Sequence, residues 1–125
     1  MNLVDSSAWL EYFADAPNAG YFADAIEDET ELLVSAINLY EVFKRVQQQR
    51  GENAALRAVA MMEAGRLVEV DESIALHGAQ LSARHKLAMA DSLILATARA
   101  HDAVLWTQDA DFEGLDGVRF QAKHR

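Results

Sequence analysis

A chain of 125 residues, 51% of them hydrophobic, can bury one core but is too short for two typical domains, so we expect one domain over residues 1–125. The absence of cysteine excludes a disulfide framework, a thiolate zinc site and a cysteine nucleophile, and it fits a cytoplasmic protein. The 20 acidic and 11 basic residues give a formal net charge of -9, which opposes nucleic-acid binding unless bound cations reverse the charge locally.

Five short apolar segments have the length of β-strands, and longer stretches with a helical repeat of apolar residues separate them. Such alternation is typical of an α/β fold with a largely parallel sheet. The apolar runs are too short to span a membrane, and no secretion signal precedes them, so we expect no membrane association. The predicted strands lie at residues 3–4, 32–34, 67–70, 103–106 and 118–120.

Local signals set several helix boundaries. Ser35 is placed to cap a helix over residues 36–50, and Gly51 follows at a position where helices often stop. Either Asp71 or Ser73 can begin a later helix, since both residue types favour the N-cap.

Asp5 follows the first predicted strand and precedes a helix that starts at Ser6. Open parallel sheets bind their ligands at the carboxyl ends of the strands, where Asp5 would lie. The structural alternative is a helix N-cap, a position at which aspartate is common. Position alone leaves both interpretations open.

Glu41 lies at the edge of the broad apolar face of the predicted helix over residues 36–50. We therefore expect a partly buried carboxylate. The alternative is a solvated glutamate paired with Lys44 or Arg45 on the helix surface.

Asp91 shares one face of a predicted helix with Ile94, Leu95 and Ala98, at the spacing i, i+3, i+4 and i+7. An ionised carboxylate at the head of an apolar stripe takes up a proton or finds a cation. The alternative is an ordinary acid in the first turn, favoured by the helix dipole.

Asp109 and Asp111 come directly after the strand predicted at residues 103–106. Like Asp5, they would stand at the carboxyl end of a strand, although a short acidic turn is also common there. Either of the two can supply the fourth acidic position of a site.

The acids indicate a site only when taken together, because a cluster of carboxylates destabilises a fold unless cations occupy it. An all-oxygen ligand set selects Mg²⁺ or Mn²⁺ over zinc. Such ions lower the pKa of a bound water and stabilise the leaving oxygen of a phosphodiester, which is nuclease chemistry. Ser6 and Thr107 are placed to hydrogen-bond a metal-bound water or phosphate, and the alternative is a role in capping or at a strand end. The candidate metal ligands are Asp5, Glu41, Asp91, Asp109 and Asp111.

The four acidic segments, in this order, resemble the signatures of the PIN domain, and most closely those of VapC-type toxins. The segments are Leu3-Val4-Asp5-Ser6-Ser7, the helix around Glu41, Ala90-Asp91-Ser92-Leu93-Ile94-Leu95-Ala96 and Thr107-Gln108-Asp109-Ala110-Asp111-Phe112.

The resemblance implies a three-layer α/β/α sandwich around a mainly parallel sheet and a Mg²⁺- or Mn²⁺-dependent endoribonuclease. It also implies a homodimer and a cognate VapB-like antitoxin as partner. Carried over by position, the catalytic carboxylates are Asp5, Glu41, Asp91 and Asp109, with Asp111 sharing the fourth metal position.

Three other functions remain as alternatives: a stand-alone RNA-processing PIN nuclease, a receiver-like signalling domain and an inactive interaction module. The receiver alternative is weakened because Asp5 is followed by Ser6 and Ser7, and no lysine follows Trp106 directly. The histidines are scattered and predict no zinc site or triad; they are His77, His85, His101 and His124.

Overall fold

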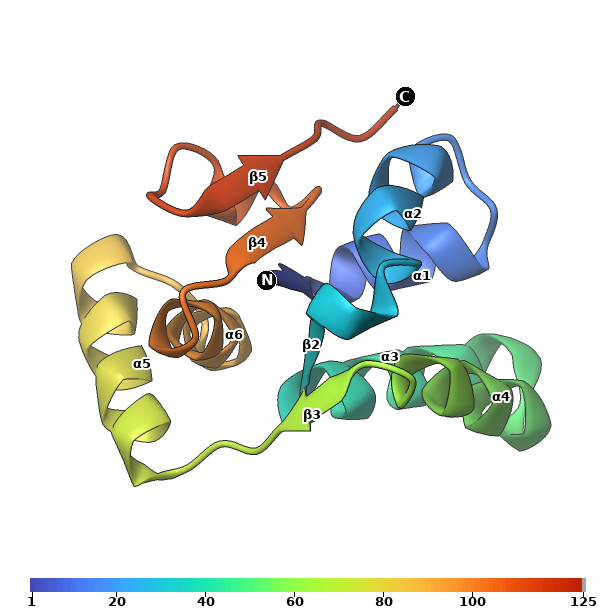
Figure 1. Cartoon of the computed structure of the whole chain (residues 1–125), viewed down its shortest axis with the longest axis horizontal. Coiled ribbons are helices and arrows are strands. Elements are labelled where there is room, and N and C mark those ends of the chain that lie inside the picture. Colours follow the sequence, from blue (N-terminus) through green and yellow to red (C-terminus); the bar gives the residue numbers. More distant parts are fainter. Residues whose placement is uncertain (125) are drawn as a thin grey trace.

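A computed structural model describes residues 1–124 as a five-stranded sheet with helices packed on both faces (Figure 1). In chain order the elements are β1 (Asn2–Val4), α1 (Ser6–Phe13), α2 (Ala19–Ile26), the 3-10 turn η1 (Glu29–Glu31), β2 (Leu32–Ser35), α3 (Ala36–Arg50), α4 (Glu52–Met62), β3 (Arg66–Val68), α5 (Glu72–His85), α6 (Met89–Ala100), β4 (Val104–Thr107), the 3-10 turn η2 (Ala110–Phe112) and β5 (Val118–Phe120).

The sheet has the strand order β3-β2-β1-β4-β5, and every neighbouring pair of strands is parallel. From the central β1 the chain moves outward through β2 to β3, then returns to place β4 on the other side of β1. The strand order therefore reverses between β1 and β4. In an open α/β sheet, this point leaves a crevice at the carboxyl ends of the two strands, where ligands bind.

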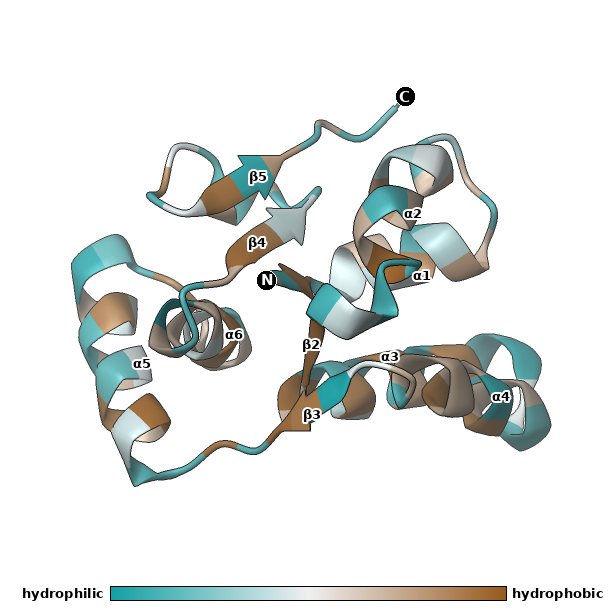
Figure 2. Ribbon diagram, viewed as in Figure 1, coloured by the Kyte–Doolittle hydropathy of each residue, from teal (hydrophilic) through white to brown (hydrophobic). Residues whose placement is uncertain are grey.

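Residues that alternate along the strands serve two separate cores. Val4 and Trp106 point into a cluster with α1, α2, α3 and α4, whereas Leu3 and Leu105 point into a cluster with α5 and α6. β2 and the first part of β4 are accordingly coloured as hydrophobic (Figure 2). These two cores confirm the predicted three-layer α/β/α architecture.

The predicted elements agree with the observed ones, with small shifts at the ends of strands. The helix over residues 36–50 is confirmed, and Ser35 caps it by accepting a hydrogen bond from the N–H of Ile37 at 3.1 Å. Asp71, rather than Ser73, caps α5. The prediction that Val70 lies in a strand is wrong: β3 ends at Val68, and Val70 is apolar because it packs against the core under α5 and α6.

Gly51 alone connects α3 and α4, which lie side by side (Figure 1). Its N–H donates to the carbonyl of Gln47 at 3.0 Å, and its own carbonyl accepts from the N–H of Ala55 at 3.2 Å. The backbone angles of Gly51 are φ 88° and ψ 172°, a conformation that is essentially restricted to glycine. One residue therefore ends one helix, reverses the chain and starts the next.

None of the helices within residues 1–124 combines the length and the apolar character that crossing a bilayer requires.

Replacing Gly51 with alanine should lower the free energy of unfolding by about 1–3 kcal/mol, because a β-carbon strains the backbone at this φ. The cause is conformational, since no atom within 4 Å would meet the added carbon. Gly20 is the matched control: it has equal space but lies within α2, so Gly20→Ala should stabilise by about 0.5 kcal/mol. Urea denaturation of both variants tests this, and equal stabilities would contradict it.

Candidate metal centre

The carboxyl ends of β1 and β4 bring three of the candidate acids to one edge of the sheet. Asp5 follows β1, and its N–H donates to the carbonyl of Trp106 on β4 at 2.8 Å, so the sheet pairing continues up to the site. Asp109 and Asp111 follow β4 and belong to the turn η2. The predicted position of these acids at strand ends is therefore confirmed.

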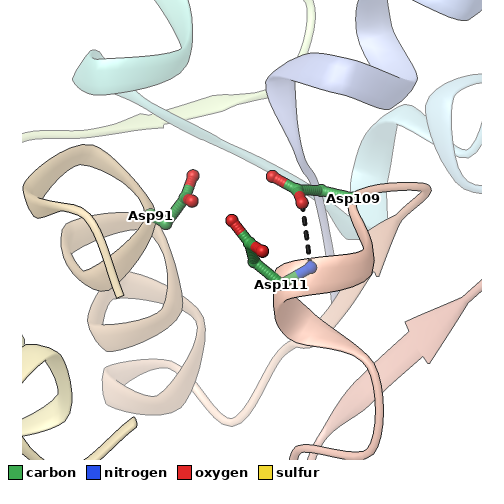
Figure 3. A group of neighbouring side chains, drawn as sticks. All are labelled: Asp91, Asp109 and Asp111. Carbon is green, nitrogen blue, oxygen red and sulfur yellow. Dashed lines mark hydrogen bonds between the residues drawn. The ribbon is translucent and has the colours of Figure 1, made fainter. Parts of the chain in front are cut away.

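The most compact part of the site consists of Asp91, Asp109 and Asp111. One carboxylate oxygen from each lies within 4.8 Å of those of the other two. Asp91 comes from the first turn of α6, and its carboxylate faces the turn that carries the other two (Figure 3). On the same helix, Ile94 and Leu95 are fully buried, as the predicted apolar stripe requires.

Asp5 occupies the N-cap position of α1, but its side chain makes no capping hydrogen bond. Instead, one carboxylate oxygen, Oδ2, accepts hydrogen bonds from the hydroxyls of Ser7 at 2.7 Å and Thr107 at 2.9 Å. The residue is only 3% exposed. The capping alternative is thus correct for the backbone and wrong for the carboxylate, which is held inside the site.

Glu41 is drawn towards the other acids by the residue next to Asp5. The hydroxyl of Ser6 donates to Oε1 of Glu41 at 2.7 Å and accepts from the amide Nδ2 of Asn38 at 3.0 Å. Glu41 is partly buried, as its place on the edge of the apolar face predicts. Asn38 was not among the predicted site residues, although its spacing from Ser35 is the signature of a reciprocal helix cap.

Thr107 joins two of the acids through one hydroxyl. Its Oγ1 accepts the backbone N–H of Asp109 at 2.9 Å while donating to Asp5. Asp109 in turn accepts the backbone N–H of Asp111 at 2.9 Å, which caps the turn η2 (Figure 3). Asp109 therefore stabilises the acidic turn, as the structural alternative predicted, and it also belongs to the acidic cluster.

The electrostatics tie all five carboxylates into one group. Burial and the negative charges of the other four acids together raise the pKa of Asp91 to about 7, with burial the largest cause and Asp5 the largest of the charge effects. Burial also raises the pKa of Asp5, with added repulsion from Asp109 and Glu41, against the opposing hydrogen bonds from Ser7 and Thr107. Asp5 and Glu41 thus lie close enough to repel Asp91, although neither is part of the compact group of three.

Within the described residues, no lysine, arginine or histidine forms an ion pair with this cluster. Throughout residues 1–124 the sole ion pair joins the N-terminal amine to Glu31 at 3.5 Å, away from the site acids. The side-chain atoms that could face a metal ion here are carboxylate and hydroxyl oxygens, and no histidine belongs to the cluster. This ligand set suits hard divalent cations such as Mg²⁺ or Mn²⁺.

A family model for the PIN domain matches residues 3–118, which include all five site acids. The chain belongs to the PIN domain family. This assignment decides against the receiver-like alternative. No curated protein matches the sequence.

Solved PIN structures share the fold at low sequence identity. A toxin–antitoxin complex from Klebsiella pneumoniae aligns with a TM-score of 0.82 at 24% identity, over 95% of this chain and 96% of that one. VapC20 from Mycobacterium tuberculosis, described as a toxin that cleaves the sarcin–ricin loop, aligns with a TM-score of 0.78 at 18% identity, over 93% and 95%. FitAcB from Neisseria gonorrhoeae aligns with a TM-score of 0.72 at 22% identity, over 96% of each chain.

Asp91→Asn should stabilise the metal-free protein in a pH-dependent way. Because the pKa of Asp91 rises from 3.8 to about 7 on folding, the folded chain binds a proton that the unfolded chain releases between these values. The parent is therefore penalised fully above about pH 7, and the penalty fades towards about pH 4. Thermal unfolding in EDTA should show a higher midpoint for the variant at about pH 8 and a vanishing difference near pH 4.

The control for this comparison is Asp24→Asn, which removes one exposed acid from α2. A similar stabilisation by both variants at high pH would attribute the effect to net charge and contradict a local origin.

Proposed function

We propose that the protein is a divalent-metal-dependent endoribonuclease and the toxin of a VapBC-like toxin–antitoxin pair. The observation that carries the proposal is the un-neutralised cluster of carboxylates between β1 and β4 in a PIN domain. The proposed catalytic carboxylates are Asp5, Glu41, Asp91 and Asp109, with Asp111 as a further metal ligand.

In this proposal the carboxylate side chains hold the metal ion and orient a water molecule, and the water, not a side chain, attacks the phosphorus. Oδ2 of Asp5 is taken by two hydroxyls, which leaves Oδ1 without a hydrogen bond inside the described chain and available as a ligand. In the same way, Ser6 holds Oε1 of Glu41, and Oε2 has no hydrogen bond within residues 1–124. Fixing one oxygen of each carboxylate presents the other in a defined direction, which is the preorganisation that a metal site needs.

A bound Mg²⁺ or Mn²⁺ would lower the pKa of a coordinated water and stabilise negative charge on the phosphate. The acids would remain ionised with the cation present and would orient the water for in-line attack on phosphorus. The products would be a 5′-phosphate and a 3′-hydroxyl. The raised pKa of Asp91 fits this role, since its negative charge becomes favourable only beside a cation.

An antitoxin partner is supported by solved structures that share this fold and contain an antitoxin. The Klebsiella pneumoniae structure is a toxin–antitoxin complex, and VapBC2 from Rickettsia felis was solved bound to a fragment of its promoter. The net charge of -9 favours a partner that brings basic residues to this surface. We also propose a homodimer, a single domain over residues 1–125 and a place in the cytoplasm.

A stand-alone RNA-processing nuclease is the second candidate, because the same site would serve it. A short open reading frame beside this gene that encodes a DNA-binding protein would favour the toxin; co-expression should then abolish cleavage and growth arrest.

Millimolar Mg²⁺ or Mn²⁺ should raise the thermal midpoint of the parent by mass action, with about 2.7 kcal/mol of stabilisation when the ion is at 100 times its Kd. Asp91→Asn should lose most of this shift because it removes one carboxylate of the compact group. Asp24→Asn should keep the shift. Thermal melts at constant ionic strength test this, and an equal shift for both variants would place the ion elsewhere.

Asp91→Asn should also reduce RNA cleavage by about 100-fold or more, because a lost ligand removes several kcal/mol of transition-state stabilisation. Initial rates on a labelled RNA with Mn²⁺ measure this, with Asp24→Asn as the control at parental rate. Circular dichroism should show an unchanged fold. Cleavage by purified Asp91→Asn at the parental rate would refute the proposed function.

A further inference from the structure

A groove of about 500 Å³ lies beside the carboxylate cluster, among α1, α3, α4 and the segment after β5. Ser7 and Gln108 are part of its lining. Ser7 donates to the carboxylate of Asp5, and Gln108 immediately precedes Asp109. Through these two residues the groove reaches the edge of the proposed cleavage site.

The lining of the groove reverses the charge balance of the chain. The chain carries 20 acidic and 11 basic residues, yet four basic side chains and one acidic side chain line the groove. The acid, Glu11, has both oxygens engaged: Oε1 accepts from Nε2 of Gln108 at 3.1 Å and Oε2 from the N–H of Asn18 at 2.8 Å. The basic side chains are Arg45, Arg50, Arg57 and Lys123.

These cations are exposed, and in the part of the chain that the structure describes none of them forms an ion pair. Three of them belong to the pair of helices joined by Gly51: Arg45 and Arg50 on α3, and Arg57 on α4. Lys44 is not among them, because its ammonium group lies 5.8 Å from the ring centre of Tyr40 and lines a separate hollow. The groove thus selects a subset of the basic residues on these helices.

Apolar side chains line the same groove, among them Leu10, Phe13 and Met61. Phe13 stacks on the buried ring of Trp9 with ring centres 5.5 Å apart, so its position is fixed. Proteins that bind single-stranded nucleic acids combine positive charges, which attract the phosphate backbone, with apolar and aromatic side chains, which contact the bases. An acidic peptide would use the cations but would have less use for the aromatic face.

We propose that this groove binds a single-stranded segment of the RNA next to the cleavage point, with its phosphates paired to Arg50 and Arg57. This inference rests on the proposed nuclease function and extends it to the way the substrate is held. The groove attracts the backbone on one side while the carboxylates, once loaded with cations, receive the phosphate to be cut.

The test compares Arg50→Gln/Arg57→Gln with Arg66→Gln/Arg84→Gln, a control that removes the same charge from exposed arginines outside the groove. Affinity for a short fluorescent single-stranded RNA is measured by anisotropy on the full chain in EDTA, so that the RNA stays intact. The groove variant should bind about tenfold more weakly, and its slope of log affinity against log salt should shrink by about 1.4, or 0.7 for each lost phosphate contact. The control should match the parent on both counts.

Equal RNA affinities and salt slopes for the two double variants would overturn the proposal. So would a groove variant that loses affinity for a poly-glutamate peptide while its RNA affinity is unchanged, since that result would assign the groove to an acidic polypeptide. In cleavage assays with Mn²⁺, the groove variant should raise KM and leave kcat near the parental value, as expected for contacts shared by ground and transition states. If the parent protein binds RNA without cutting it, the nuclease function is refuted. The anisotropy comparison of the two double variants would then still test whether the groove binds RNA.

Discussion

Repulsion among carboxylates that no ion pair within residues 1–124 neutralises is the constraint around which this structure is arranged. The strand order places Asp5 and Asp109 beside each other at the carboxyl edge, and α6 adds Asp91 from across the crevice. Serine and threonine hydroxyls orient these groups but bring no positive charge. The two hydrophobic cores must therefore supply the stability that the site removes, a common exchange between stability and function.

Hydrogen-bond chemistry explains why hydroxyl groups, and not charged side chains, hold the carboxylates of the site. A hydroxyl can donate only one proton, so each of Ser6, Ser7 and Thr107 fixes a single carboxylate oxygen and leaves the second one open. An arginine in the same place would satisfy both oxygens and cancel the charge, which would close the site to a cation. Neutral hydroxyl donors thus hold the carboxylates in place and leave one oxygen of each available to a cation.

Local periodicity predicted an α/β fold with a largely parallel sheet, and the ends of the predicted strands indicated where the acids lie, whereas the three layers were implied by the resemblance to the PIN domain. The sequence could not predict how the acids are held, since the hydrogen bond from Thr107 to Asp5 joins residues 102 positions apart. The N-cap interpretation of Asp5 shows the limit well: position identified the cap, but the side-chain direction depended on a neighbouring strand. For the fourth acid, the structure brings both Asp109 and Asp111 to Asp91, so the alternatives left open by the sequence are both part of the cluster.

The single-residue connection at Gly51 has an evolutionary consequence. The pair of helices that it joins is rooted at β2, with Glu41 near the root, whereas Arg50 adjoins the far turn and Arg57 lies midway along α4. Insertions or substitutions at that turn would reshape the groove beside it and leave the carboxylates undisturbed. Such a layout lets the lining of the groove vary while the acidic cluster is retained, and it suits a fold that a solved structure shares at 14% identity.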